Sequence, residues 1–284
     1  MNPRSRPRIV VTPAGRRAYL EILYKHLVVQ RSSFDTWQLW LNTTNEDDLL
    51  YMRNLAMKHP DWIVARELSE PHNGNFSICS FFPGASIPGT TYLRLDDDIV
   101  WLESGFIENI MSYREAHTHP FLVYGNIVNN AITSHVFQRL GCIDTELGIV
   151  GYECMDTLGW KSPEFATKVH RTFLESHALH DLDRWKYPIW TLSFYERVSI
   201  NAIAWLGEDF ATFNGAVGRD EEQWLSVDKP RSIRRPNVIL GNKLCAHYAF
   251  FPQRPELDKT NILEEYKKLA MEPGPTRSDL IKIL

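Results

Sequence analysis

The sequence predicts an α/β fold in which a mainly parallel central sheet is flanked by helices. In the first hundred residues, short apolar runs alternate with segments whose apolar residues repeat at helical spacing. Strands separated by helices pair in parallel and place the helices on both faces of the sheet. The 284 residues, of which 44% are hydrophobic, are also enough to bury the large core that such a layered fold needs.

The expected elements follow in order along the first half of the chain. The predicted strands are 9–11, 37–41, 62–65, 92–95 and 121–124, with helices over 19–27 and 47–56 between the first three strands. Thr44 or Asn45 can cap the second helix, and Pro60 ends it. Ligands of such sheets bind at the carboxyl ends of the strands, so the polar tips 12–13, 42–43 and 96–98 should lie along one rim.

The second half of the chain is less regular. Ser193 and Glu196 match a capping box, which predicts a helix that runs through Trp205 and ends at Gly207. We therefore expect two halves, 1–128 and 129–284, within one continuous domain.

Three consecutive aspartates, Asp96, Asp97 and Asp98, close the strand at 91–95, and another apolar run follows at once. Like charges this close cannot all stay ionised unless a cation lies among them. If the strand continues through them, Asp96 and Asp98 share a face and Asp97 points away. Two carboxylates on one face suit Mg²⁺ or Mn²⁺ that also grips phosphate oxygens. An acidic turn is the alternative, although its usual Gly or Asn is absent.

Composition excludes several classes of function. The net charge of −4 implies no general nucleic-acid affinity. The four cysteines form no CxxC pair, so we expect buried thiols rather than a zinc knuckle. No signal peptide and no apolar run of about 18 residues is evident, which favours a cytoplasmic protein. Arg4, Arg6 and Arg8 at the start, or the partly apolar end 279–284, could touch an anionic membrane peripherally; solvated termini are the alternative.

The order of these motifs resembles that of GT-A fold glycosyltransferases. The shared features are a nucleotide-binding half, an Asp-x-Asp after a mid-chain strand, an acidic cluster about a hundred residues later and a late histidine. The resemblance covers roughly residues 8–253, and segments 11–17 and 39–43 look like those of bacterial polysaccharide-building members. It implies transfer of a sugar from a UDP-, GDP- or dTDP-linked donor to a glycan or lipid-linked acceptor, with inversion. The half over 1–128 would then bind the nucleotide sugar, and the half over 129–284 would bind the acceptor and carry out catalysis.

The resemblance also implies roles for individual residues. Asp96, Asp98 and His247 would hold Mn²⁺ or Mg²⁺, which neutralises the departing diphosphate. Asp220 or Glu221 would be the base that takes the acceptor proton, with Asp220 preferred. Each role has a structural alternative. His247 could be an ordinary core histidine, and acids at the start of a helix commonly stabilise it.

Nucleotide contacts are expected from the sheet rim. The residues concerned are Thr12, Pro13, Arg16, Asn42, Thr43, Arg66, Asp96 and Asp97, with ordinary loop polarity or capping as the alternative for each. Lys243 and Arg254 flank His247 and could reach the diphosphate. Trp160, Trp185, Trp190 and Trp224 could stack on sugars, although Trp is mainly a packing residue.

Two other functions stay open. A sugar-phosphate nucleotidyltransferase also combines this kind of half-domain with carboxylate-bound Mg²⁺, but it normally carries a glycine-rich phosphate loop after the first strand. Segment 12–17 contains only one glycine. A non-catalytic glycan-binding protein would have no nucleotide affinity. The missing GxGxxG sequence argues against a dinucleotide-dependent dehydrogenase.

Overall fold

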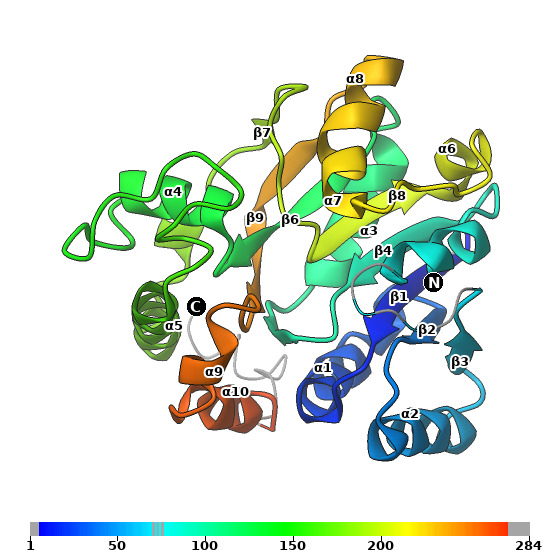
Figure 1. Cartoon of the computed structure of the whole chain (residues 1–284), viewed down its shortest axis with the longest axis horizontal. Helices are drawn as coiled ribbons and strands as arrows, with labels where there is room; N and C mark the ends of the chain where they lie inside the picture. The colour runs from blue at the N-terminus through cyan, green and yellow to red at the C-terminus, as the bar shows by residue number, and fades with distance from the viewer. Residues whose placement is uncertain (1–5, 70–71, 73, 75–76, 272–284) are drawn as a thin grey trace, which may run out of the picture.

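The computed structural model describes residues 6–69, 72, 74 and 77–271 (Figure 1). Arg4 and the segment 279–284, which the sequence suggests as membrane contacts, lie outside the described residues. Within them, Arg6 pairs with Glu208 and Arg8 donates to Glu108 at 2.7 Å, so these two cations contact the protein itself. None of the described helices has the length and apolar character needed to cross a membrane.

The first half of the sheet is parallel, as predicted. Its strands lie in the order β3 (Ile63–Glu67), β2 (Thr36–Leu41), β1 (Arg8–Ala14) and β4 (Thr91–Leu95). Helix α1 (Arg17–Val29) connects β1 to β2, and α2 (Glu46–Lys58) connects β2 to β3. The Asn45 side chain caps α2 by accepting from Asp47 N at 2.9 Å. Figure 1 shows both helices on the same side of the sheet.

The second half extends the same sheet with mixed pairing. Strand β8 (Ala202–Leu206) lies antiparallel between β4 and β6 (Val123–Val128), and β6 runs parallel to β9 (Val238–His247). Strands β5 (Ile99–Leu102) and β7 (Trp190–Thr191) pair antiparallel with β9. Both predicted halves therefore contribute to one sheet.

The other α-helices of the described residues are α3 (Phe106–Ala116), α4 (Ala131–Arg139), α5 (Pro163–Ala178), α6 (Gly207–Ala211), α7 (Glu221–Gln223), α8 (Lys229–Ile233), α9 (Arg254–Leu257) and α10 (Ile262–Leu269).

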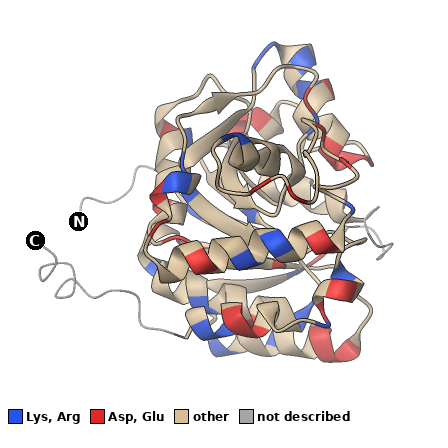
Figure 2. Ribbon diagram, turned by 90° about the vertical axis from the view of Figure 1, so that its left-hand side faces the viewer, with Lys and Arg blue, Asp and Glu red and all other residues tan. Residues whose placement is uncertain are grey.

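Two hydrophobic cores cover the opposite faces of the sheet. Alternation along β1 sends Val10 into one core and Val11 into the other, and β4 divides Leu93 and Tyr92 in the same way. Strands buried on both faces explain the continuous apolar runs of the sequence. Figure 2 shows acidic and basic residues interspersed along the ribbon. This agrees with the small net charge.

The helix predicted from Ser193 through Trp205 is wrong. Half of the capping box does form, because Ser193 N donates to the Glu196 carboxylate at 2.7 Å, but no helix follows. Residues Ala202–Leu206 instead form β8, whose five residues are all buried. A central strand gains hydrogen bonds on both edges and burial on both faces, and these outweigh a cap worth about 1 kcal/mol. Gly207 begins α6 and does not end a helix.

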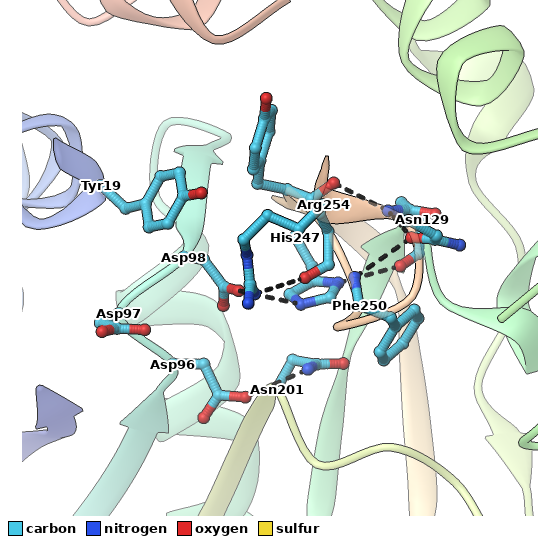
Figure 3. A network of polar contacts seen from close by, with 12 residues as sticks. Tyr19, Asp96, Asp97, Asp98, Asn129, Asn201, His247, Phe250 and Arg254 are labelled. Carbon is cyan, nitrogen blue, oxygen red and sulfur yellow. Dashed lines mark hydrogen bonds and ion pairs between the residues drawn. The ribbon is translucent and has the colours of Figure 1, made fainter. Parts of the chain in front are cut away.

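The three aspartates form a turn between β4 and β5 and do not continue a strand. Ile99 N donates to Asp96 O at 3.1 Å and closes this turn. The expectation that Asp96 and Asp98 share a face while Asp97 points away is therefore wrong. Asp97 faces the end of β1, Asp98 faces His247, and Asp96 faces Asn201 (Figure 3).

Candidate functional site

A cleft of about 700 Å³ opens at the carboxyl ends of β1, β2 and β4. It is lined from the first half by Pro13, Gly15, Arg16, Asn42, Thr43, His72, Gly74, Ile78, Arg94, Asp96, Asp97 and Asp98. The second half contributes Met155, Trp160, Arg197, Ile200, Asn201, Arg219, Asp220, Glu221, Glu222, His247, Ala249, Phe250, Phe251 and Arg254. The polar strand tips do meet at one rim, as the topology of a parallel sheet requires.

Asp97 fixes the junction between β1 and α1. Its carboxylate accepts from Gly15 N at 2.9 Å and from the Arg16 guanidinium at 3.1 Å. A side chain at position 15 would lie 2.8 Å from the Asn42 carbonyl oxygen, so this turn requires glycine. Asp97 therefore holds the Arg16 guanidinium in the cleft.

Asp98 is the charge centre of the cleft. Its Oδ2 atom lies 2.8 Å from Arg254 Nη2, 3.0 Å from Arg16 Nη2 and 3.5 Å from His247 Nε2. Only 2% of the residue is exposed. Burial alone would raise the pKa of Asp98, but the positive charge of Arg16 and the contact with His247 hold it well below its usual range. Asp98 is thus ionised at neutral pH.

The orientation of His247 is set by its other ring nitrogen. His247 Nδ1 lies 3.1 Å from the Asn129 carbonyl oxygen, which can only accept a hydrogen bond. This contact fixes the plane of the ring, so that Nε2 lies 3.5 Å from Asp98 Oδ2 (Figure 3). Asn129 adopts a left-handed φ of 60° and is held by Tyr248 O at 2.9 Å and Gln253 Oε1 at 3.0 Å. These hydrogen bonds hold the His247 ring in a fixed orientation, as is typical of metal-binding histidines.

Asp96 belongs to a different network. Arg94 Nε donates to Asp96 Oδ1 at 2.7 Å, and Asn201 Nδ2 donates to Asp96 Oδ2 at 3.1 Å. Burial raises the pKa of Asp96 although Arg94 opposes it. The same guanidinium donates to Glu221 at 2.9 Å through Nη1. Arg94, with 4% of its side chain exposed, therefore joins two carboxylates of the cleft.

Glu221 is a carboxylic acid of the cleft whose pKa is raised. Burial raises its pKa from an ordinary 4.5 to about 7, despite the opposing charge of Arg94. Only 13% of its side chain is exposed, and its buried Oε2 atom has no hydrogen-bond partner among the described residues. A carboxylate with a pKa near neutrality can accept a proton from a substrate hydroxyl.

Arg197 binds the carboxylates of the two neighbouring acids, Asp220 and Glu222. Its Nη1 and Nη2 atoms donate to both oxygens of Asp220 at 2.9 and 3.0 Å, and Nε donates to Glu222 at 2.8 Å. Asp220 also caps α7 by accepting from Gln223 N at 3.1 Å. More than half of the Asp220 side chain (57%) is exposed. Asp220 therefore has the environment of a stabilising cap.

The remaining predicted residues divide between the cleft and its surroundings. Pro13, Asn42, Thr43 and Arg254 line the cleft. Thr12 lies inside β1, is fully buried and accepts from Trp37 Nε1 at 2.9 Å. Arg66 and Lys243 are not among the lining residues, and Lys243 pairs with Glu103 at 3.0 Å. Of the four tryptophans, Trp160 lines the cleft whereas Trp185 is core.

The cleft contains side chains that could bind a divalent cation. Across the described ranges, no group of three or more His, Cys, Asp or Glu is arranged to hold a metal. The Asp98 carboxylate and the His247 Nε2 atom nevertheless face each other at 3.5 Å. Two such ligands suit Mg²⁺ or Mn²⁺, which usually completes its coordination with water and substrate phosphate. These residues fit a cation shared with a ligand.

The sequence does not indicate several residues that form or support the cleft. Arg94 is two residues before Asp96, but nothing in the sequence indicates that a strand residue reaches Glu221. Arg197 and Asn201 lie in a segment for which a helix is predicted. Asn129 and Gln253 carry no motif, and only the tertiary fold brings them to His247.

No protein-family model and no curated protein matches the sequence. Among solved structures, the chain is similar to GalNAc-T7 bound to UDP, GalNAc and Mn²⁺, with a TM-score of 0.53 and 10% identity over 93% of this chain and 47% of that one. The fold class is confirmed. The chain spans about half of the GalNAc-T7 chain, and at this identity the likeness shows the fold alone.

Two further structures give lower scores. CMP:2-keto-3-deoxy-manno-octonic acid synthetase complexed with CTP has a TM-score of 0.48 and 8% identity, covering 93% of this chain and 98% of that one. TarS (residues 1–349) from S. aureus has a TM-score of 0.48 and 10% identity, covering 98% and 75%.

Proposed function

We propose that this protein is a glycosyltransferase that moves a sugar from a nucleoside-diphosphate donor to an acceptor hydroxyl. One observation carries the proposal. A buried acid with a pKa of about 7, Glu221, lies in the same cleft as the facing pair Asp98 and His247. Glycosyl transfer needs both a proton acceptor and a centre that stabilises the departing diphosphate.

The donor would bind on the first-half side of the cleft. Pro13, Asn42 and Thr43 offer backbone and side-chain groups to the base and ribose at the rim. Arg16 and Arg254 both lie at Asp98 and would neutralise the diphosphate. In this proposal neither Thr12 nor Arg66 contacts the donor, since neither lines the cleft.

A divalent cation, Mn²⁺ or Mg²⁺, fits beside the diphosphate. Asp98 and His247 would hold it, and Asp96 would support the site through Arg94 and Asn201. When bound, the cation supplies Lewis-acid stabilisation of the leaving diphosphate. The protein's own residues keep Asp98 ionised through the charge of Arg16 and fix the orientation of the His247 ring through the Asn129 carbonyl.

Glu221 is our choice for the base, in preference to Asp220. Glu221 lines the cleft with a pKa of about 7, and the bond to Arg94 fixes its carboxylate in position. Both oxygens of Asp220 are already bonded to Arg197. A base that activates the acceptor on the side opposite the leaving group implies inversion of configuration.

The nucleotidyltransferase alternative meets a specific obstacle. That reaction needs backbone N–H groups after the first strand to cradle a triphosphate. Here Gly15 N already donates to Asp97 at 2.9 Å. The turn therefore holds a carboxylate of the protein where such an enzyme would bind its substrate.

Calorimetric titration with UDP, GDP and dTDP, each with and without Mn²⁺, tests the proposal. We expect one nucleotide to bind in a Mn²⁺-dependent manner, and Asp98→Ala to abolish this binding, whereas Asp220→Asn keeps it. Absence of nucleotide binding would instead favour a glycan-binding protein. Pyrophosphate release from a sugar 1-phosphate and a nucleoside triphosphate would identify a nucleotidyltransferase.

A further inference from the structure

An aromatic wall extends outward from the reaction centre. The rings of His247 and Phe250 lie 4.5 Å apart, and those of Phe250 and Trp160 lie 6.1 Å apart. The cleft lining continues through Phe251, which is 81% exposed, and Met155, which is 52% exposed. Large apolar side chains that stay open in a cleft usually mark a ligand surface.

A buried glutamine holds this wall in place. Gln253 is fully buried, and its Oε1 atom accepts from Phe250 N at 3.1 Å and from Asn129 Nδ2 at 3.0 Å. Its Nε2 atom donates to the Gly159 carbonyl at 3.4 Å, next to Trp160. Asn129 also orients His247. One polar network thus fixes both the wall and the histidine, so the surface is formed before any ligand arrives.

Polar groups line the same cleft. Asn201 and Arg197 are among the lining residues, as is Arg219, which is exposed and has no hydrogen-bond or ion-pair partner in the described part of the chain. A pyranose matches such a surface, because its C–H face stacks on aromatic rings while its hydroxyls meet polar groups. A hydrocarbon chain would instead leave these polar groups desolvated without partners.

We propose that the wall formed by Trp160, Phe250 and Phe251 binds a pyranose ring of a saccharide acceptor. This inference rests on the proposed function, since it gives the wall to the acceptor and the rim at Asn42 to the donor. A ring stacked there shares the cleft with Glu221. The proton would pass from its hydroxyl to the Glu221 carboxylate as the hydroxyl oxygen bonds to the anomeric carbon and the diphosphate leaves with its electron pair.

Saturation-transfer NMR with methyl glycosides of glucose, galactose, mannose and rhamnose tests the inference. We expect saturation of the ring C–H protons of at least one glycoside, and about tenfold weaker binding in Phe251→Ala and Trp160→Ala. Phe251→Tyr should retain binding because the ring remains. Tyr195→Ala is the matched control, since Tyr195 is 71% exposed and does not line the cleft.

Two results would overturn the inference. One is that no methyl glycoside binds, or that binding is unchanged in both alanine variants. The other is that octyl glycosides receive saturation on the alkyl chain alone, which would assign the wall to a lipid. Mn²⁺-dependent nucleotide binding is measured in the same variants. If nucleotide binding is retained alongside either result, only the proposed acceptor site is rejected. If nucleotide binding is absent, the proposed glycosyltransferase function is rejected.

Discussion

The substitution Glu221→Gln should stabilise the protein while it removes transfer. Burial raises the pKa of Glu221 from 4.5 to about 7, so the folded protein carries an ionised carboxylate at an unfavourable position. A glutamine resembles the protonated acid and avoids this cost. Because the folded-state pKa is raised, the cost is absent below about pH 4.5, grows as the pH rises and reaches its full value above about pH 7.

The expected gain depends on pH in a calculable way. With one pKa unit equal to about 1.4 kcal/mol, the free energy of unfolding should rise by about 3 kcal/mol at pH 8 and by less than about 1 kcal/mol at pH 5. Transfer should fall by roughly 10²–10⁴-fold, the usual contribution of a general base. Donor binding should be unchanged, because Glu221 acts on the acceptor.

Urea denaturation at pH 5 and pH 8, with transfer assayed at pH 8, measures both effects. Glu222→Gln is the matched control, since the carboxylate of that neighbour pairs with Arg197 at 2.8 Å and has no part in the proposed reaction. A gain that is equal at the two pH values would refute the burial argument. A variant that is stabilised at pH 8 but still active would refute the role of Glu221 as the base.

Two further expectations concern the networks around this acid. Arg94→Leu removes the charge that lowers the pKa of Glu221, so the midpoint of the acidic limb in a pH–rate profile should move above 7. An unchanged midpoint would show that Arg94 does not influence the acid that titrates in the reaction. Gln253→Leu leaves Phe250 N and Asn129 Nδ2 without their buried acceptor, and should lower the free energy of unfolding by about 2–4 kcal/mol in urea titrations. A loss below about 0.5 kcal/mol would show that the aromatic wall is held by other contacts.

Local sequence patterns predict the parallel half of the fold well. The strands around Val10, Leu39 and Leu93 are buried on both faces, so their apolar runs are continuous, and the helices between them carry regular apolar spacing. The acidic turn at 96–98 also stands out in the sequence, because charged residues directly after a buried strand are unusual. In both cases the signal is local, and the topology of parallel strands turns it into a position at one rim.

Prediction fails where distant segments decide the outcome. Ser193 and Glu196 form part of a cap, yet pairing of β8 with β4 and β6 determines the structure that follows. The choice between Asp220 and Glu221 depends on the positions of Arg197 and Arg94, which approach from other elements. A sequence shows that acids are present, but only the fold shows which acid is left with a free oxygen.

If the proposed function holds, the ion pairs at Asp98 predict that metal and nucleotide bind cooperatively. The carboxylates of Asp97 and Asp98 are balanced by the guanidiniums of Arg16 and Arg254. A cation alone would add positive charge to this balanced group, and a diphosphate alone would add negative charge, so each lowers the electrostatic cost of the other. Since such coupling is reciprocal, Mn²⁺ should tighten nucleoside diphosphate binding by the same factor as the nucleotide tightens Mn²⁺, on the order of 10–100-fold. Titrations in both orders measure the two factors, and independent binding would show that the arginines alone carry the diphosphate.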